Sequence, residues 1–281
     1  MQDGLVRRGP VLLRAVGHVR RLMANKDLGL IAAGVAFYSI LSIFPGIAAT
    51  IALWGLIGDP ARALEEVARY KALLPADVYA LIEAQLLQLV DADGLTLGWA
   101  SILSFGLAIW TARAGVAALI RGLNAIYEVP NRGGFWHAVQ ALFLTLCLIV
   151  VAVVALGSVV IAPVVLSFVD LGPWTAWGLA LLRWTIALVV LLAAFALVYR
   201  IGPNVAAREH GFLTAGGVIA AVGWAIASAG FSVYLANFGN YNEVYGSIGA
   251  VIAMLMWLYI SAWLVLLGGA LNAALNTSRE R

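Results

Sequence analysis

Two arginines lie inside long apolar stretches of this 281-residue chain, where a charged side chain is costly. Arg113 lies within the run 95–119, and Arg183 lies near the middle of the run 174–199. A cation at the centre of a membrane-spanning helix costs about 2.5–3.5 kcal/mol even on the insertion scale, so such residues usually face a cavity or a partner. No Asp or Glu lies deep in any long apolar run. An unpaired cation of this kind suits an anionic headgroup or solute, although its side chain could also snorkel to the membrane surface.

Asn124 extends the polar face that begins at Arg113. At 100° per residue, the two side chains lie within about 20° of each other if the helix continues to Asn124. The pair would then form a polar stripe that ends at the inner surface, although Asn124 could instead cap the helix or bind the next loop. Further candidates for the same ligand site are Tyr38, Ser39, Arg132 and Tyr245.

Enzyme chemistry finds little support in the residues. Metal-dependent phosphodiester cleavage needs clustered Asp, Glu and His ligands. The residues that could supply them on one side of the membrane show no recognisable ligand spacing: His18, Asp27, Glu128, His137, Glu209 and His210. The chain has no Gly-Lys-Ser/Thr phosphate-binding loop, and the single cysteine, Cys147, excludes an intramolecular disulfide. We therefore expect no catalytic residue, no metal, no cofactor and no enzymatic activity.

The first long apolar run, 28–58, holds 31 residues without a charge, more than the ~20 that a helix needs to cross a bilayer. Pro45 and Gly46 lie near its middle. Proline removes a backbone donor and clashes with the preceding turn, so we expect a hinge or break in this span. In lipid, the freed carbonyls near residue 41 need other partners, such as the hydroxyls of Ser39 and Ser42, a neighbouring helix or water.

The whole composition indicates an all-α polytopic membrane bundle. Hydrophobic residues make up 63% of the chain and charged residues 11%, against ~25% charged residues in soluble domains. Six spans are expected, at about 28–58, 95–119, 138–169, 174–199, 212–238 and 245–275, in one transmembrane domain over 28–275. Residues 59–93 are too charged to span and are expected to form amphipathic helices at the outer surface. Residues 276–281 would form a short cytoplasmic tail.

The basic residues indicate the orientation. With the amino terminus in the cytoplasm, the inner segments hold 12 of the 17 Lys and Arg residues and the outer segments hold 3, while Arg113 and Arg183 lie in spans. This asymmetry follows the positive-inside rule and predicts that both termini are cytoplasmic. It also accounts for the net charge of +3 without a nucleic-acid partner. The basic, amphipathic segment 1–27 either lies on an anionic membrane surface or packs on the bundle as a cap helix.

Several segments resemble one family of bacterial inner-membrane proteins. They are AFYSILSIFPGI in the first span, LNAIYEVPNR after the second, IGPNVAAREHGFLTAGGVIA, and YNEVYGSIGAVIAMLMWLYISAWLVLLGGALNAAL in the last span. Together they resemble the YihY/virulence factor BrkB family over about residues 28–275. The resemblance implies a six-span protein of the bacterial inner membrane. Members of that family have carried an older ribonuclease label, and others are linked to serum resistance or lipopolysaccharide export.

Three functions fit these observations. The first is a transporter or flippase-like protein for an anionic lipid or amphipathic solute, which the intramembrane arginines and the Pro45 break favour. The second is a scaffold or envelope assembly factor that does not transport, because no buried carboxylate offers proton coupling. A membrane-associated ribonuclease is a distant third. The expected partners are membrane lipids, anionic ones included, and a protein partner or a second copy of the chain.

Overall fold

The computed structural model describes residues 17, 19, 21–57, 67–68, 79–80, 83–84, 87, 94–157, 173–205, 214–236 and 239–279. Within them the side chains of 50–57, 94–98, 100–101, 156, 173–176, 180, 183, 236, 239–248 and 277–279 are not described. Six long helices make up most of this part of the chain, and it contains no β-strand. They are α2 (Leu28–Ile57), α5 (Gly94–Ile126), α6 (Gly134–Leu156), α8 (Pro173–Ile201), α9 (Ala215–Ala236) and α10 (Gly239–Arg279).

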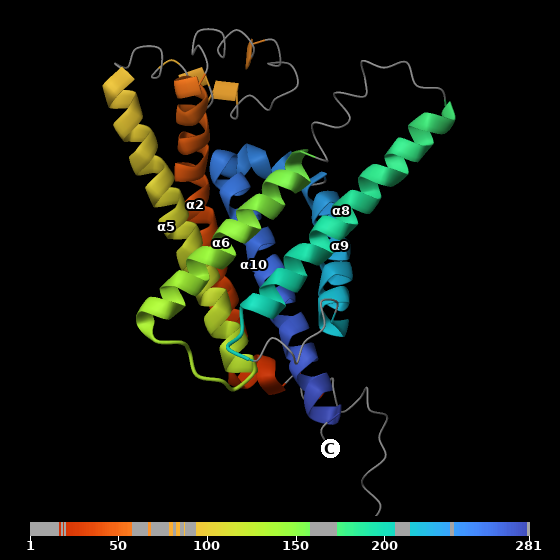
Figure 1. Ribbon diagram of the computed structural model, residues 1–281. Coiled ribbons are helices and arrows are strands. Elements are labelled where there is room, and N and C mark those ends of the chain that lie inside the picture. The colour runs from red at the N-terminus through yellow and green to blue at the C-terminus, as the bar shows by residue number, and fades with distance from the viewer. Residues whose placement is uncertain are drawn as a thin grey trace, which may run out of the picture.

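Each of the six helices contains a segment long and apolar enough to cross a membrane. The helices alternate in direction, so the start of α2 and the end of α10 lie at the same end of the molecule (Figure 1). The predicted all-α, six-span bundle is therefore confirmed. We call this end the convergent end; it is formed by Leu28, Ile126, Gly134, Ile201 and Ala215 together with the last turns of α10.

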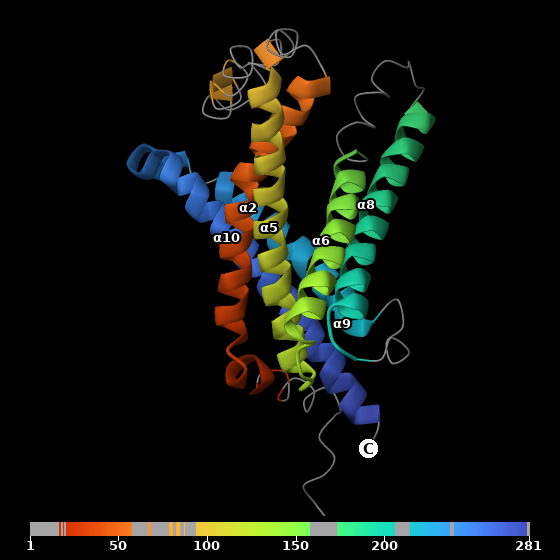
Figure 2. The same cartoon turned by 60° about the vertical axis from the view of Figure 1, so that its left-hand side comes forward.

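The helices form a ring in which each contacts the next. Helix α2 packs on α5, α5 on α6, α6 on α8, α8 on α9, α9 on α10, and α10 on α2, while α10 also contacts α5. Figure 2 shows the α6–α8 pair standing apart from the α2–α5 pair over much of their length. Antiparallel neighbours joined by connections at alternate ends explain this order.

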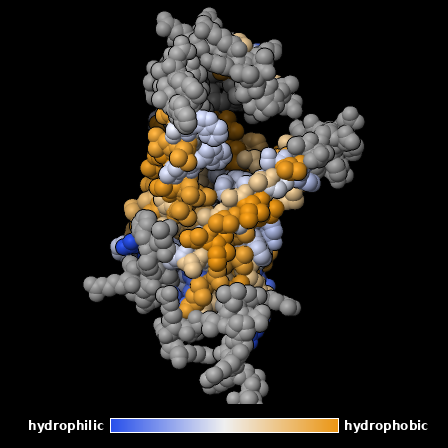
Figure 3. Space-filling view, turned by 90° about the vertical axis from the view of Figure 1, so that its right-hand side faces the viewer, coloured by the Kyte–Doolittle hydropathy of each residue, from blue (hydrophilic) through white to orange (hydrophobic). Residues whose placement is uncertain are grey.

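The buried core lies toward the convergent end. Leu28, Leu123, Tyr199 and Leu266 are among its most buried side chains, and all belong to one cluster. The opposite halves of the helices carry exposed large apolar side chains instead, which include Ile102, Leu103, Val150, Val153, Leu181, Leu182 and Val233. Figure 3 shows apolar side chains across the middle of one face and strongly hydrophilic ones in its lower part. Lipid tails are the surroundings in which such exposed apolar surface is stable.

The structure shows no interruption of the first span at the predicted hinge or break. Helix α2 runs without interruption from Leu28 to Ile57, with Pro45 and Gly46 inside it. The Ser42 hydroxyl donates to the Ser39 carbonyl at 2.7 Å, one turn before the proline. Proline removes the donor that would bond the Leu41 carbonyl, and apolar surroundings favour keeping the remaining helical hydrogen bonds. Packing of α2 along α5 supports the same path.

Helix ends also differ from the predicted spans. The second helix continues past residue 119 to Ile126, the third begins at Gly134 rather than 138, and residues 239–242, expected in a loop, are helical. The apolar run measures the depth of hydrocarbon, whereas a helix can continue into water beyond it. At the start of α6, Gly133 is the N-cap, with an extended backbone (φ −53°, ψ 153°). Most of the expected outer segment 59–93, and residues 158–169 of the expected third span, lie outside the described residues.

The described part of the amino-terminal segment packs on the bundle. Residues 21–25 are helical, and Val19 and Leu22 are buried in the same core cluster as Leu28. Arg21 is exposed, and its Nε donates to the Gly17 carbonyl at 3.3 Å. Of the two alternatives for this segment, these contacts favour the cap helix.

Candidate functional site

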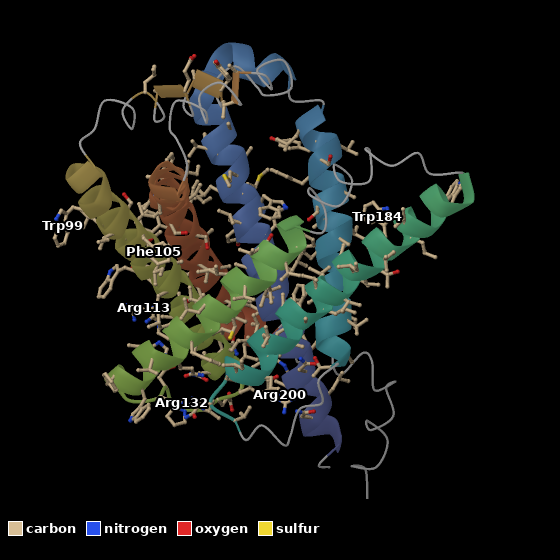
Figure 4. All side chains as sticks on the ribbon, turned by 45° about the horizontal axis from the view of Figure 1, so that its top comes forward. Trp99, Phe105, Arg113, Arg132, Trp184 and Arg200 are labelled. Carbon is tan, nitrogen blue, oxygen red and sulfur yellow. The ribbon has the colours of Figure 1, made fainter. Side chains whose placement is uncertain are left out.

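Arg113 lies on the outside of the helix ring. Its guanidinium carbon is 4.7 Å from the centre of the Trp110 ring, one turn earlier on α5. The side chain is half-buried, and its Nε atom is buried without a hydrogen-bond partner among the described residues. Trp110 itself is 64% exposed. Figure 4 shows Arg113 at the margin of α5 beside α6, with Trp99 pointing outward farther along the same helix.

The face of α5 that carries Arg113 packs on α6. Ala117 and Ile120 follow Arg113 on this face, and both are buried against Ala141 and Leu144 of α6. Because α5 continues to Ile126, Asn124 falls on the same face, as the sequence predicts. The buried side chains of Ala117 and Ile120 lie between Asn124 and Arg113 on this face. The two polar residues therefore have different roles.

Asn124 ties together two loops at the convergent end. The residue is 1% exposed. Its Nδ2 donates to Asn131 Oδ1 at 2.8 Å, and its Oδ1 accepts the backbone N–H of Asn204 at 2.7 Å. Arg132 Nε donates to Asn204 Oδ1 at 3.0 Å, and Asn204 Nδ2 donates to the Pro130 carbonyl at 3.1 Å. We call these residues the asparagine hub; it fastens the loop between α5 and α6 to the loop after α8.

A second polar cluster caps α9. Thr214 is its N-cap, since its hydroxyl accepts the backbone N–H of Gly217 at 3.0 Å. Asn272 of α10 accepts the N–H of Gly216 at 2.8 Å and donates to the Thr214 hydroxyl at 2.9 Å. No spacing in the sequence would place Asn272 there, because the two segments are more than fifty residues apart.

Tyr127 lies beside this second cluster, and its hydroxyl should lose its proton only at high pH. Burial raises the pKa of its hydroxyl to about 12, and the hydrogen bond with Asn272 opposes part of that rise. The folded state thus holds the proton more tightly than the unfolded state, so this contribution to stability is complete below about pH 10 and is lost as the pH rises through about 12. We expect an alkaline titration of tyrosinate absorbance to lose a component near pH 12 in Tyr127→Phe. A lost component near pH 10 would contradict this assignment.

His137 joins Arg113 at the seam between α5 and α6. Its ring lies near the Ala117 backbone, but neither ring nitrogen makes a well-formed hydrogen bond with a described residue, and both are buried. Arg113 and Arg121 are the charged side chains that act on it. His137 comes one turn after the start of α6. Sequence reasoning considered His137 only as a metal ligand, and its position beside two arginines depends on how α6 packs.

Comparison with known protein families identifies the family of this chain. The virulence factor BrkB family matches residues 19–281. This chain belongs to that family. The predicted resemblance is therefore confirmed, and the BrkB-family protein is a multi-pass membrane protein.

Relatives of this BrkB-family protein carry names with little functional detail. It is 31% identical over 260 residues to the ribonuclease-like protein YfkH of Bacillus subtilis, with 88% of this chain and 90% of that protein covered. It is 30% identical over 275 residues to a UPF0761 membrane protein of Ralstonia nicotianae and 27% identical over 278 residues to one of Aromatoleum aromaticum. The match covers 95% and 96% of this chain but only 60% and 66% of those two proteins. No solved structure matches the chain.

Two of the remaining predicted site residues, Tyr38 and Ser39, lie away from Arg113. Tyr38 and Ser39 of α2 face Gly115 of α5, where an added Cβ would lie 3.4 Å from Tyr38 Cβ and 3.5 Å from Ser39 Oγ. Residues two apart on a helix differ by about 200°, so that face of α5 is nearly opposite Arg113. The side chains of Arg183 and Tyr245 lie outside the described residues.

No three His, Cys, Asp or Glu side chains gather into a metal-binding group in the part of the chain that the structure describes. Glu128 forms an ion pair with Lys26 at 3.1 Å. The backbone of Glu128 has a positive φ of 55°, which turns the chain out of α5 into the loop.

Proposed function

We propose that this BrkB-family protein is a flippase-like transporter of an anionic lipid in the bacterial inner membrane, with both termini in the cytoplasm. The observation that supports this most directly is Arg113. It is a cation within an apolar span, it faces the membrane side of the ring, and it has no acidic partner among the described residues.

Arg113 fits a ligand better than it fits a purely structural contact. The Trp110 ring offers the guanidinium a cation–π contact, worth about 0.5–1 kcal/mol at an exposed site. That energy is smaller than the cost of keeping a cation in an apolar span, about 2.5–3.5 kcal/mol at its centre. An anionic headgroup would supply the missing charge and hydrogen-bond acceptors.

The shape of the ring is compatible with lipid movement. The core and both polar clusters hold the helices together at the convergent end, while the opposite halves expose apolar side chains. Lipid tails can remain in the bilayer along such a surface while the headgroup moves past polar groups. The chain has no phosphate-binding loop for ATP, so transport would be passive, use a gradient or depend on a partner, and we propose no enzymatic step.

A non-transporting scaffold is the second candidate. Side-chain hydrogen bonds of the asparagine hub and of the cap on α9 hold the α5–α6 loop, the loop after α8 and the start of α9. A rigid convergent end of this kind also suits a protein whose role is to hold a partner.

Reconstitution separates the two candidates. Vesicles of phosphatidylcholine with a trace of fluorescent phosphatidylglycerol are bleached from outside by dithionite, with and without an imposed ion gradient. Transport predicts that vesicles containing the protein lose more than about half of the fluorescence, and that Arg113→Gln slows the exchange about tenfold, or about 1.4 kcal/mol. Arg200→Gln, which changes an exposed arginine at the convergent end, should stay within about twofold. Wild-type vesicles that behave as empty ones under both conditions would favour the scaffold.

A further inference from the structure

Three basic side chains converge on the membrane-facing seam between α5 and α6. Arg113 and Arg121 are eight residues apart on α5, which separates them by about 12 Å along the helix and about 80° around it. His137, one turn into α6, is close enough to both arginines for their positive charge to act on its ring. No acidic side chain among the described residues acts on this group, and Glu128 is paired with Lys26. The cluster therefore holds positive charge without a counter-ion from this part of the chain.

Three polar atoms of this cluster make no well-formed hydrogen bond to any described residue. They are Nε of Arg113 and both ring nitrogens of His137. A buried donor or acceptor left unpaired costs about 1–3 kcal/mol. A group with several acceptor oxygens and a negative charge would recover this energy, and arginine binds phosphate oxygens with short, charge-assisted hydrogen bonds.

Exposed aromatic and apolar side chains frame the cluster. Trp136 precedes His137 and is 67% exposed, and Phe135 packs edge-on against it with ring centres 5.8 Å apart. Tryptophan rings favour the level of lipid headgroups. Farther along the face of α5 that carries Arg113, Trp110 and Ile102 are exposed. A ligand bound here would meet cations at headgroup level and apolar side chains beyond them.

We infer that Arg113, Arg121 and His137 form a binding site for the phosphate group of an anionic phospholipid at the seam between α5 and α6. This inference deepens the proposed function, on which it rests for the idea that the lipid is also moved. A phospholipid fits better than a free anion because the exposed apolar face adjoins the cations. The lipid's acyl chains would cover that face while its phosphate meets the basic side chains.

Lipid binding can be measured without transport. The purified full-length protein in detergent is titrated with phosphatidylglycerol, phosphatidylcholine or inorganic phosphate, and bound species are counted by native mass spectrometry. We expect phosphatidylglycerol to be retained over phosphatidylcholine. The triple variant Arg113→Gln, Arg121→Gln, His137→Gln should bind phosphatidylglycerol about tenfold more weakly, or about 1.4 kcal/mol, with phosphatidylcholine binding unchanged. Arg200→Gln is the matched control and should bind as wild type does.

Folding is checked by gel filtration and thermal unfolding of each variant. If the triple variant does not fold, Arg121→Gln alone replaces it, because Arg121 is exposed, and about a threefold weakening is expected. Unchanged phosphatidylglycerol retention in a folded variant would overturn the site. Equal competition by inorganic phosphate would overturn the lipid assignment. Specific retention without exchange in vesicles would keep this site and remove the transport proposal, whereas exchange that survives loss of binding would do the reverse.

Discussion

Replacing Gly268 by alanine should remove most of the folded protein, because α10, α9 and α8 meet at this residue. A Cβ added at Gly268 would lie 2.6 Å from the Gly216 carbonyl oxygen and 2.7 Å from Ala220 Cβ, and it would overlap the Tyr199 hydroxyl. An added Cβ at Gly216 would overlap the Gly268 carbonyl in turn. Two of the three neighbours of Gly268 belong to a helix that the ring holds in place, so they cannot move aside cheaply.

The expected loss combines two contributions. Overpacking a well-packed core costs about 1–3 kcal/mol. Displacing Tyr199 would also break the bond from its hydroxyl to the Val265 carbonyl, 2.7 Å in length, which is worth about 1 kcal/mol. We expect a loss of about 3 kcal/mol, which corresponds to a fall in Tm of about 6–12 °C for a protein of this size class. Thermal unfolding followed by tryptophan fluorescence in detergent measures it.

Gly230→Ala is the matched control for Gly268→Ala. Gly230 also lies in a helix of this pair, on α9, but an added Cβ there meets no atom within 4 Å. Its Tm should be unchanged or slightly higher, because alanine favours a helix more than glycine does. A Gly268→Ala protein that melts within about 2 °C of wild type would show that α9 and α10 can separate at no cost.

The sequence predicts the spans well because each one must hide its own backbone from lipid. A run of about 20 apolar residues is therefore both necessary and recognisable, and all six were found. The same reasoning does not predict the residue at which a helix ends, as α5 shows. Arg121 ends the apolar run, yet the helix continues to Ile126 because Leu123 and Ile126 are buried in the core. Pro45 lies inside α2 without ending it, because one missing hydrogen bond does not end a helix whose neighbouring residues are all helical.

The site was predicted in part. Arg113 and Asn124 stood out because polar residues are rare in apolar runs, and both lie on one face of α5. Their partners could not be found that way. Asn204 lies eighty residues from Asn124 and meets it only because α8 returns to the convergent end. His137 reaches Arg113 only through the packing of α6 on α5.

The asparagine hub would hold the proposed lipid site in place. Arg113 and His137 belong to different helices, so their approach depends on the loop between α5 and α6. The hub binds that loop through Asn131, Pro130 and Arg132. Gln140 of α6 adds a contact one turn after His137, donating to the Gly202 carbonyl at 2.8 Å. The loop contacts therefore fix the start of α6, and with it the imidazole, relative to α5.

Asn124→Leu should destabilise the protein strongly, but it leaves the Arg132–Asn204 and Gln140–Gly202 contacts to hold the cationic cluster. Leucine is similar in size, but it can neither accept the Asn204 N–H nor donate to Asn131 Oδ1. Each polar group left unpaired in a buried place costs about 1–3 kcal/mol, so the two together predict a loss of about 3 kcal/mol. We expect a Tm about 6–12 °C lower, and faster hydrogen exchange at the Asn204 amide.

Asn131→Ala is the control, because it removes one of the same bonds from an exposed loop where water can replace it. Its cost should be about 1 kcal/mol or less. The comparison also separates two roles for Asn124. If Asn124 only holds the loops, phosphatidylglycerol retention by Asn124→Leu stays near the wild-type value at temperatures where the variant is folded. An unchanged Tm with lost retention would instead make Asn124 a ligand residue, as the polar stripe in the sequence predicts, and would place the lipid phosphate farther along α5 toward the asparagine hub.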